Sequence, residues 1–234
     1  MKCWLFNILL FWSIIITAQD IKVVLFPFQE TQIAARLDSV VLPYQLKTGE
    51  QFRKGNIICS FDASRYELEV QKMTNHYEFA KAVLEDKRRL HNNKFTSDYE
   101  LKKAEFDMTM AAISLAEAKL NLSFCSIIAP FDGKITEFIT KEYELCRPGQ
   151  PLIRIINDSK LLASANIPMQ QKNLFKVGNT ISIKLIDNTT VSGTVYEISP
   201  QADHRSETIK IKILVNNSQG KITCGITGVL QYGE

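Results

Sequence analysis

Residues 63–123 contain neither glycine nor proline, although the whole chain of 234 residues has 10 glycines and 7 prolines. Both residues break helices, so their absence over such a length favours long helices. The second half of the stretch carries apolar residues at alternating spacings of three and four, which places them on one seam of a helix. These are Leu101, Ala104, Met108, Ala111, Leu115, Ala118 and Leu122.

The first half of the stretch repeats this spacing in Tyr66, Val70, Met73, Tyr77, Ala80 and Leu84. Two seams separated by a short polar break at His91-Asn92-Asn93 predict an antiparallel coiled-coil hairpin. We expect the arms to run from about Ala63 to His91, capped by Asp62 or Ser64, and from about Ser97 to Ser123, with Ser97 as the cap and Glu100 completing a capping box. At ~1.5 Å per residue each arm would be about 40 Å long, so the hairpin should project from its domain.

Histidine is scarce, and the three histidines (His76, His91 and His204) lie far apart in the sequence. No spacing typical of a metal site or a catalytic triad occurs, and there is no glycine-rich phosphate loop. We therefore expect no catalytic residue, no metal and no cofactor. The 28 basic and 25 acidic residues nearly balance, which argues against nucleic acid as a partner.

Charged residues are almost absent before Asp20, since Lys2 is the only one there. This basic start and the apolar run that follows predict a secretory signal peptide over residues 1–18, cleaved before Gln19. An uncleaved inner-membrane anchor is the alternative, although the run is short for a membrane span. Export would place the chain in an oxidising compartment, where Cys59 and Cys125 could form a disulfide or remain buried thiols.

Two segments on either side of the hairpin resemble each other. The turn of Gly49 to Gly55 matches that of Tyr143 to Gly149, and each leads into an apolar strand that ends near an aspartate, Asp62 or Asp158. The sequence thus contains two copies of a small β segment, which form the two halves of one module with the hairpin inserted between them. We assign residues 37–62 and 126–157 to this module and residues 63–125 to the hairpin.

The remaining segments are rich in short strands. Residues 158–234 alternate apolar and polar residues between turns, which predicts a small β-barrel domain. Residues 19–36 are predicted to be an extended strand region. This region either joins the barrel or forms a vestigial membrane-proximal part. The predicted fold class is mixed α and β, elongated and multidomain.

Four sequence elements, taken in order, resemble the periplasmic adaptor proteins, also called membrane fusion proteins (the HlyD-like family). They are the glycine-bounded segment ending at Phe61-Asp62 with Tyr66 after it, Ile128-Ala129-Pro130-Phe131-Asp132-Gly133-Lys134-Ile135, Pro148-Gly149-Gln150-Pro151-Leu152 with Ile155, and the run from Ile198 to Asn217. The resemblance implies a lipoyl-like module split by the hairpin, with turns at Gly49, Gly55, Pro130, Gly133 and Gly149, followed by the barrel.

The resemblance also implies a function. The chain would be the periplasmic adaptor subunit of a tripartite efflux pump of the resistance-nodulation-division type, associated with the inner membrane. It would bridge an inner-membrane transporter to an outer-membrane channel, support the export of small molecules and assemble into a ring, expected to be a hexamer. An adaptor of an ATP-driven exporter or type I secretion system is the alternative within the same plan.

The hairpin tip is the expected partner-binding site. The family pattern there is an arginine, a leucine four residues on and a serine seven beyond, which Leu90 and Ser97 fit while Asp86 takes the place of the arginine. Arg88 and Arg89, within one turn, are the candidate substitutes. The predicted contact residues are Asp86, Lys87, Arg88, Arg89, Leu90, Lys94 and Ser97. Two further departures are Tyr143 and Asp38, each at a position where the family usually has glycine.

Three other functions deserve comparison. A biotin or lipoate carrier would need a modifiable lysine at the turn that joins the half-modules, and here the helices replace that turn. An enzyme is disfavoured by the scattered histidines. A structural coiled-coil protein of the envelope differs from an adaptor only through the family resemblance.

The predicted seam can be tested by placing a charge in it. We expect Leu115→Asp to unfold the hairpin, because the carboxylate would be buried without a partner. Far-ultraviolet circular dichroism of the full chain should lose helical signal. An unchanged signal would show that the predicted seam is in the wrong register.

Overall fold

The computed structural model describes residues 21–232, and the predicted signal peptide lies outside them. Contacts group the chain into two compact units: residues 27–160 with 217–221, here called the hairpin unit, and the remaining described residues, here called the barrel unit. The strands are β1 (Lys22–Ala34), β2 (Ser39–Val40), β3 (Gln51–Phe52), β4 (Ile57–Ser60), β5 (Ser126–Ile128), β6 (Gly133–Phe138), β7 (Leu145–Cys146), β8 (Pro151–Pro168), β9 (Thr180–Leu185), β10 (Thr190–Asp203), β11 (Thr208–Asn216) and β12 (Thr227–Gln231).

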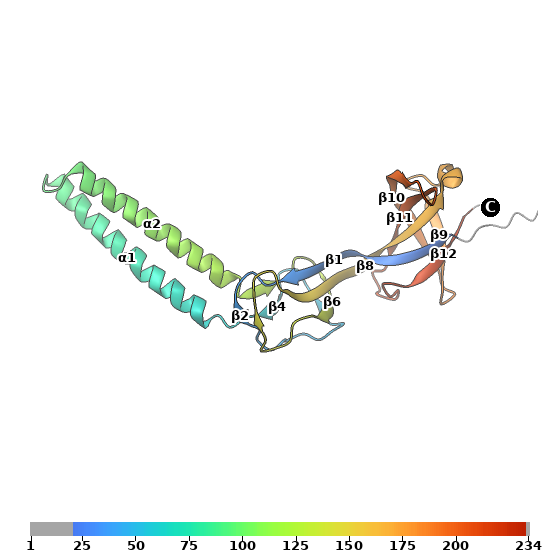
Figure 1. Ribbon diagram of the computed structural model, residues 1–234, viewed down its shortest axis with the longest axis horizontal. Coiled ribbons are helices and arrows are strands. Elements are labelled where there is room, and N and C mark those ends of the chain that lie inside the picture. The colour runs from blue at the N-terminus through green and yellow to red at the C-terminus, as the bar shows by residue number, and fades with distance from the viewer. Residues whose placement is uncertain (1–20, 233–234) are drawn as a thin grey trace, which may run out of the picture. The chain divides into compact units, whose positions relative to one another are not determined.

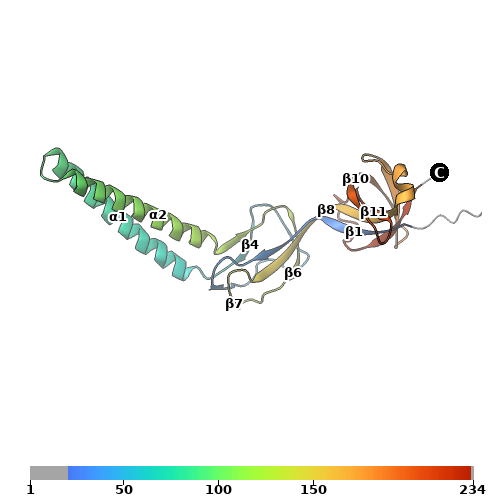
Figure 2. The same ribbon diagram turned by 45° about the horizontal axis from the view of Figure 1, so that its top comes forward.

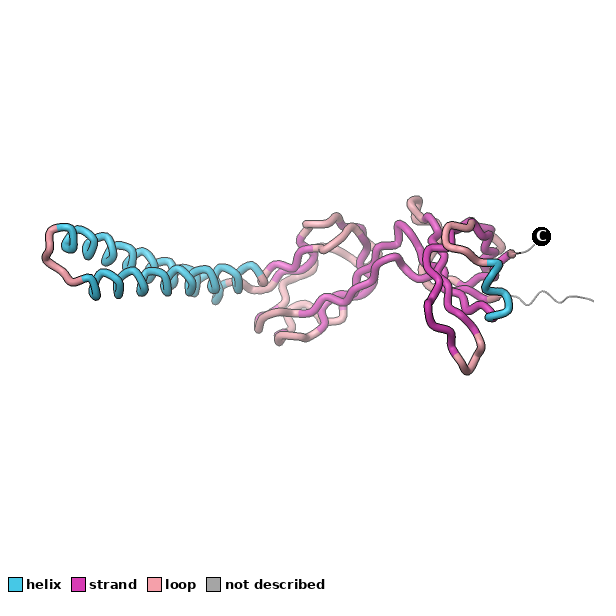
Figure 3. Tube along the Cα trace, turned by 90° about the horizontal axis from the view of Figure 1, so that it is seen from above, coloured by secondary structure: helices cyan, strands magenta, loops and turns pink. Residues whose placement is uncertain are grey.

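The helical hairpin consists of α1 (Ser64–Asn92) and α2 (Asp98–Ser123), which lie side by side along their length (Figures 1 and 2). Figure 3 shows the two helices in cyan with one short loop at their far end. The predicted break at His91-Asn92-Asn93 was placed too early, because α1 continues through Asn92 and the loop is residues 93–97. His91 and Asn92 are common in turns, but the arm contacts of α1 keep them helical here.

The seam positions are the ones that the hairpin buries most. The fully buried residues of the two helices are Ala80, Leu84, Ala104, Ala111, Leu115 and Ala118. The larger seam residues Tyr66, Val70, Met73, Tyr77, Leu101, Met108 and Leu122 are half-buried. Alanine at every second seam position of α2 lets the two helix backbones approach closely, so the arms pack with few large side chains between them.

The two arms begin differently. At α2, Ser97 is the N-cap and its hydroxyl accepts a hydrogen bond from the Glu100 amide, as predicted. At α1 the prediction of Asp62 or Ser64 as cap was wrong, since Ala63 takes that position with no side-chain cap. Asp62 instead accepts hydrogen bonds from the amide and hydroxyl of Ser64, which lowers the pKa of Asp62.

The β module of the hairpin unit is built twice, as the sequence predicted. The amide of Lys47 donates to the Glu50 carboxylate at 2.9 Å, and the amide of Lys141 donates to that of Glu144 at 3.1 Å. The second turns match as well: Arg53 donates to the Asn56 side chain, and Arg147 donates to that of Gln150. The short strands then pair across the halves, β3 with β6 and β2 with β7.

The hairpin joins this module through one pair of strands. β4 leads directly into α1 and β5 follows α2, and the two are antiparallel partners, with Cys59 opposite Ile127 and Ser60 opposite Ser126. One residue further, the Phe61 amide donates to the Cys125 carbonyl at 2.8 Å. The roots of both arms are therefore fixed next to each other by backbone hydrogen bonds.

The core of the module is apolar and contains three of the cysteines. Cys59, Cys125 and Cys146 are buried free thiols, and Cys224 lies half-buried in the barrel unit. Burial, with the neighbouring Cys146 as a smaller cause, raises the pKa of the Cys59 thiol to about 12. The alternative of a Cys59–Cys125 disulfide is not what the structure has.

Tyr143 shows what the departure from glycine does to the duplicated turn. Gly49 in the first copy has φ of 86°, and Tyr143 at the matching position has φ of 63°. The turn thus keeps its left-handed conformation, and Tyr143 bears the steric cost of its Cβ. Asp38, the other departure, has no positive φ; its carbonyl accepts a hydrogen bond from the Tyr66 hydroxyl at 2.9 Å.

The barrel unit is a six-stranded antiparallel arrangement. Its strand order is β1-β12-β9-β10-β11-β8, and β1 also pairs with β8, which returns the sheet to its first strand. Alternating residues point inward, as in β9, where Ile181, Ile183 and Leu185 are buried. The strand predicted to end near Asp158 continues to Pro168 as β8, and a 3-10 helix at Met169–Leu174 was not predicted.

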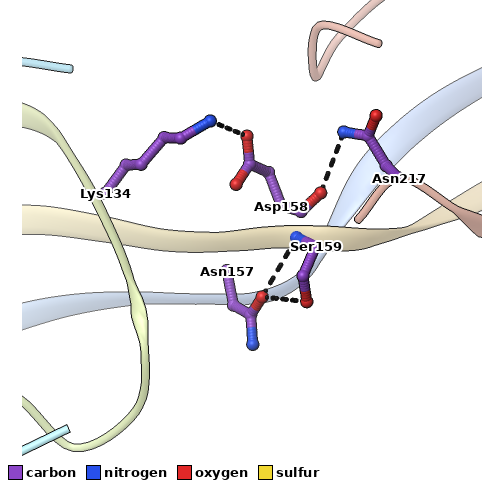
Figure 4. A network of polar contacts seen from close by, with 5 residues as sticks. All are labelled: Lys134, Asn157, Asp158, Ser159 and Asn217. Atoms are coloured by element: carbon purple, nitrogen blue, oxygen red, sulfur yellow. Dashed lines mark hydrogen bonds and ion pairs between the residues drawn. The ribbon is translucent and has the colours of Figure 1, made fainter. Parts of the chain in front are cut away.

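A polar network ties residues 217–221 to the hairpin unit (Figure 4). The Lys134 ammonium donates to the Asp158 carboxylate at 2.6 Å, and the Asn217 side chain donates to the Asp158 carbonyl at 2.9 Å. The Asn217 amide also donates to the Ser159 carbonyl, and Asn217 is only 4% exposed. This network holds the loop after β11 against β8.

Replacing Tyr143 with glycine should stabilise the chain. A left-handed residue with a Cβ costs roughly 1–2 kcal/mol, while glycine adds flexibility to the unfolded chain, so we expect a net gain of up to about 1 kcal/mol. Chemical denaturation of Tyr143→Gly against the wild type measures it. Tyr143→Ala is the matched control, because it removes the exposed ring but keeps the Cβ; an equal gain in both variants would contradict the strain argument.

Candidate functional site

The candidate site is the tip of the hairpin, where α1 ends and α2 begins. The loop closes in three steps: the Asn93 amide donates to the Arg89 carbonyl, the Lys94 amide to the His91 carbonyl, and the Phe95 amide to the Leu90 carbonyl. Lys94 takes a left-handed conformation with φ of 62°, which turns the chain back toward α2. The tip backbone is therefore well hydrogen-bonded, and its side chains project outward.

Three of the predicted basic residues at the tip are already paired with acidic residues. Lys87 contacts Glu100 at 2.7 Å and Arg88 contacts Glu105 at 3.3 Å, both across the two arms. Arg89 contacts Asp86 within α1. Arg88 and Arg89 therefore do not stand free as substitutes for the arginine that Asp86 replaces.

These pairs also perturb the acidic groups of the tip. A hydrogen bond from His91, at 2.7 Å, is the main cause that lowers the pKa of Asp98. A hydrogen bond from Lys87 is the main cause that lowers the pKa of Glu100. All of these groups are largely exposed, so each pair contributes little to stability, and their main effect is to neutralise the tip.

Three large apolar or aromatic side chains at the tip are exposed to solvent. Leu90, which the sequence predicted as a contact, is 42% exposed, and Phe95 beside it in the loop is 78% exposed. Tyr99, in the first turn of α2, is 76% exposed. Sequence reasoning missed Phe95 and Tyr99, although an aromatic residue inside a polar turn was a signal that could have found Phe95.

Lys94 and Ser97 complete the predicted set and have different roles. Lys94 is exposed, and of the four basic residues predicted at the tip it is the one for which the described chain shows no ion pair. Ser97 caps α2, which occupies its hydroxyl. The predicted capping box is only half formed, because the Glu100 carboxylate accepts from Thr96 and Lys87 rather than reaching back to Ser97.

The predicted turns of the lipoyl-like module lie far along the chain from the tip and have a structural role. Gly55 and Gly149 begin matching turns, with amides that donate to the carbonyls of Ala129 and Ala35. Gly133 lies so close to β8 that a Cβ there would meet the Ile156 carbonyl oxygen at 2.2 Å. Pro130 is exposed in the turn before β6. These residues shape the module that carries the hairpin.

The histidines are not brought together. His76 is exposed on α1, His91 pairs with Asp98, and His204 lies in the turn between β10 and β11. Within residues 21–232, no group of three or more histidine, cysteine or acidic side chains is placed to hold a metal ion. Neither of the two long helices described is apolar enough to cross a membrane.

The barrel unit matches a known domain family. Residues 163–234 match the family model described as CusB-like, beta-barrel domain. Nodulation protein NolF of Rhizobium meliloti (strain 1021) is 23% identical to this chain over 227 residues. That match covers 89% of this chain and 62% of NolF, so the chain spans less than two thirds of this relative's length.

Solved structures share this fold. A MacA-MexA chimeric protein that contains the Pseudomonas aeruginosa MexA α-hairpin domain superposes with a TM-score of 0.81 at 16% identity, covering 91% of this chain and 79% of that one. The membrane fusion protein Spr0693 of Streptococcus pneumoniae R6 gives 0.76 at 13% identity, covering 93% and 99%.

These matches confirm the resemblance that the sequence showed. The chain has the fold of the membrane fusion, or periplasmic adaptor, proteins: a split lipoyl-like module with an inserted α-hairpin, followed by a β-barrel domain.

Ser97 is predicted to contact a partner and it also caps α2, and mutation can separate these two roles. Ser97→Ala should destabilise the hairpin by about 1 kcal/mol, because the first amides of α2 lose their acceptor. Ser97→Asp should keep the stability, since aspartate caps equally well. Thermal unfolding followed by circular dichroism measures both; equal stability of wild type and Ser97→Ala would show that the cap contributes nothing.

Proposed function

We propose that this chain is a non-enzymatic adaptor that bridges an inner-membrane transporter to an outer-membrane channel in the periplasm and supports the export of small molecules. The observation that carries the proposal is the exposed apolar tip of a hairpin whose two roots are fixed on a lipoyl-like module. Such an arm places a recognition surface about 40 Å away from the module, at ~1.5 Å per residue of α2.

The chemistry of the tip refines the kind of contact. Because Lys87, Arg88 and Arg89 are neutralised by acidic neighbours, charge steering by the tip is weak, and Lys94 is its main unpaired cation. Leu90 and Phe95 instead offer apolar side chains at the end of the two antiparallel helices. We infer that the tip docks into an apolar recess between helix ends of the channel, with Phe95 and Leu90 as the buried contacts.

The barrel unit supports the other end of the bridge. Its match to the CusB-like barrel family favours a transporter of the resistance-nodulation-division type over an ATP-driven exporter. The N-terminal signal peptide and the association with the inner membrane remain part of this proposal. So does assembly into a ring, expected to be a hexamer.

Cross-linking from the tip in the native cell envelope tests the docking. A photoreactive maleimide attached at Leu90→Cys or Ser97→Cys should capture an outer-membrane protein. The same reagent at Lys119→Cys, exposed near the root of α2, should not. The native cysteines Cys59, Cys125 and Cys146 are buried and Cys224 is half-buried. Labelling of the wild type therefore measures the background from the native cysteines.

Each outcome decides one part of the proposal. Capture of an inner-membrane protein alone would contradict the docking of the tip but leave an adaptor at the inner membrane. Capture of the same outer-membrane protein from position 119 would show that the contact is not at the tip. Leu90→Asp with Phe95→Asp should abolish export in cells while the helical circular dichroism signal remains, because both side chains are exposed.

A further inference from the structure

The outer surface of the barrel unit carries a groove over three neighbouring strands. β8 lies beside both β1 and β11 in the sheet, and Figure 2 shows the three in the barrel unit. Side chains alternate along each strand, so Val23 and Ile209 face the core while the residues next to them face outward. The outward residues border two cavities of about 610 Å³ and about 500 Å³. Because Asn166, Thr208 and Lys210 border both, we treat the two cavities as one and call it the outer groove.

A bulge in β10 forms one wall of the outer groove. Between two regular pairs of β10 and β11, β10 has three residues (199–201) where β11 has only Lys210. Such extra residues leave the ladder and bend the strand. The Ser199 hydroxyl donates to the Gln201 carbonyl at 2.8 Å and accepts from the Gln201 amide at 3.2 Å. These two hydrogen bonds fix the shape of the bulge, so this wall is part of the fold.

The turn between β10 and β11 forms a second wall. The Asp203 carboxylate accepts the amides of Arg205 at 2.8 Å and Ser206 at 3.4 Å. Glu207 then takes a left-handed conformation with φ of 52°. This tightly bonded turn places His204 and Arg205 at the border of the groove.

The cations of the outer groove lack acidic partners. Within the described residues, Lys22, Arg205 and Lys210 take part in no ion pair. Lys212, the next outward residue of β11, differs, because its ammonium contacts the Glu197 carboxylate of β10 at 3.0 Å. The bulge explains the difference, since opposite Lys210 it supplies serine, proline and glutamine instead of an acid.

The balance of charge in the groove is therefore positive. Three cationic side chains border it against one carboxylate, that of Asp203, which already accepts the amides of its own turn. Lys210 borders both cavities, with Arg205 beside one and Lys22 beside the other. Cations gathered in a concave surface attract an anion more strongly than the same charges spread over a convex one.

The part of the groove along β1 is apolar. Phe26 points outward from β1 and is 49% exposed, and Val24 and Pro168 border the same cavity. Lys22 and Lys210 also border this cavity, so apolar and cationic side chains share one recess. Small-molecule sites commonly combine an apolar lining with a few polar groups that orient the ligand, and their volumes are about 300–1,000 Å³.

We propose that the outer groove binds a small anionic amphiphile. Its carboxylate, sulfate or phosphate group lies among Lys210, Arg205 and Lys22, and its apolar part lies along Phe26 and Val24. Thr208 and Asn166, which border both cavities, supply further hydrogen-bonding groups near the anion. The inference goes beyond the proposed function and does not rest on it, because it requires neither the channel nor the hairpin tip.

Two other occupants fit the groove less well. An acidic segment of another protein would match the cations but would place polar groups against Phe26. The flat surface of an anionic bilayer would not enter a concave recess. A single small molecule with one charged end satisfies both the charge and the apolar lining.

Binding of a fluorescent amphiphile to the purified full chain tests the proposal. The probe is dansyl-labelled undecanoate, whose emission rises in apolar surroundings, and its uncharged methyl amide is the matched ligand. We expect Lys210→Gln and Phe26→Ala each to weaken binding of the probe about tenfold, because one removes a charged contact and the other apolar area. Lys212→Gln is the matched control and should leave binding unchanged, since it makes the same change of charge on the same face of β11.

Several outcomes would overturn the proposal. Equal binding of the methyl amide would show that no anion is recognised, and an equal loss in Lys212→Gln would show general charge attraction instead of the groove. Displacement of the probe by polyglutamate at matched charge concentration would favour an acidic protein segment. Binding to phosphatidylglycerol vesicles that Lys210→Gln abolishes, without binding of the soluble probe, would favour the membrane. Circular dichroism of each variant verifies that the fold is kept.

Discussion

The pairing of β4 with β5 is the constraint on which the rest of the hairpin unit depends. The chain enters the hairpin from β4 and leaves it into β5, so Cys59 opposite Ile127 and Ser60 opposite Ser126 fix the distance between the two roots. Two helices joined only by their tip loop would have to find each other by diffusion. Bringing their free ends together would cost the conformational entropy of closing a long loop. Here the folded module closes that loop, and the seam needs only to align arms that already begin side by side.

The duplicated module explains why this constraint holds. Each half supplies the same turn, with a carboxylate or amide side chain that accepts a backbone amide three residues before it, as in Glu50 and Glu144. The strands of the two halves then pair with each other, β2 with β7 and β3 with β6. The left-handed Tyr143 shows how strongly this geometry is imposed, since the turn keeps its shape even where the sequence has lost the residue that fits it best.

Much of the fold follows from local patterns that survive packing. The seam of the hairpin, the duplicated turns and the alternating strands were all predictable because each is a periodic or repeated signal. The predictions that were wrong concern segments without a periodic or repeated sequence pattern. The end of α1 was placed before Asn92, because turn-forming residues were read without the arm contacts that keep them helical. β8 was predicted to end near Asp158, whereas Asp158 lies within the strand and is held by Lys134 and Asn217 from distant parts of the chain.

The tip was the least predictable part, for a related reason. Its charges could be counted, but their pairing depends on which residues of α2 come level with Lys87 and Arg88, and that requires the loop length. With the loop at residues 93–97, Glu100 and Glu105 reach across and neutralise the basic residues. The contact chemistry therefore shifts from the arginines to Leu90 and to Phe95, which no heptad pattern marks.

The small and large apolar side chains of α2 lie on opposite faces of the helix. The inward seam alternates alanine with larger residues, and its three alanines (Ala104, Ala111 and Ala118) are buried, so the two arms approach closely but bury little apolar area per turn. The outward stripe has Tyr99, Phe106, Ile113 and Leu120, which are larger and mostly exposed. If the stability of a single hairpin were the only requirement, the larger residues would stabilise it better inside. Their position outside shows that the two arms are held together by close approach of the helices at the alanines rather than by burial of the largest side chains of α2.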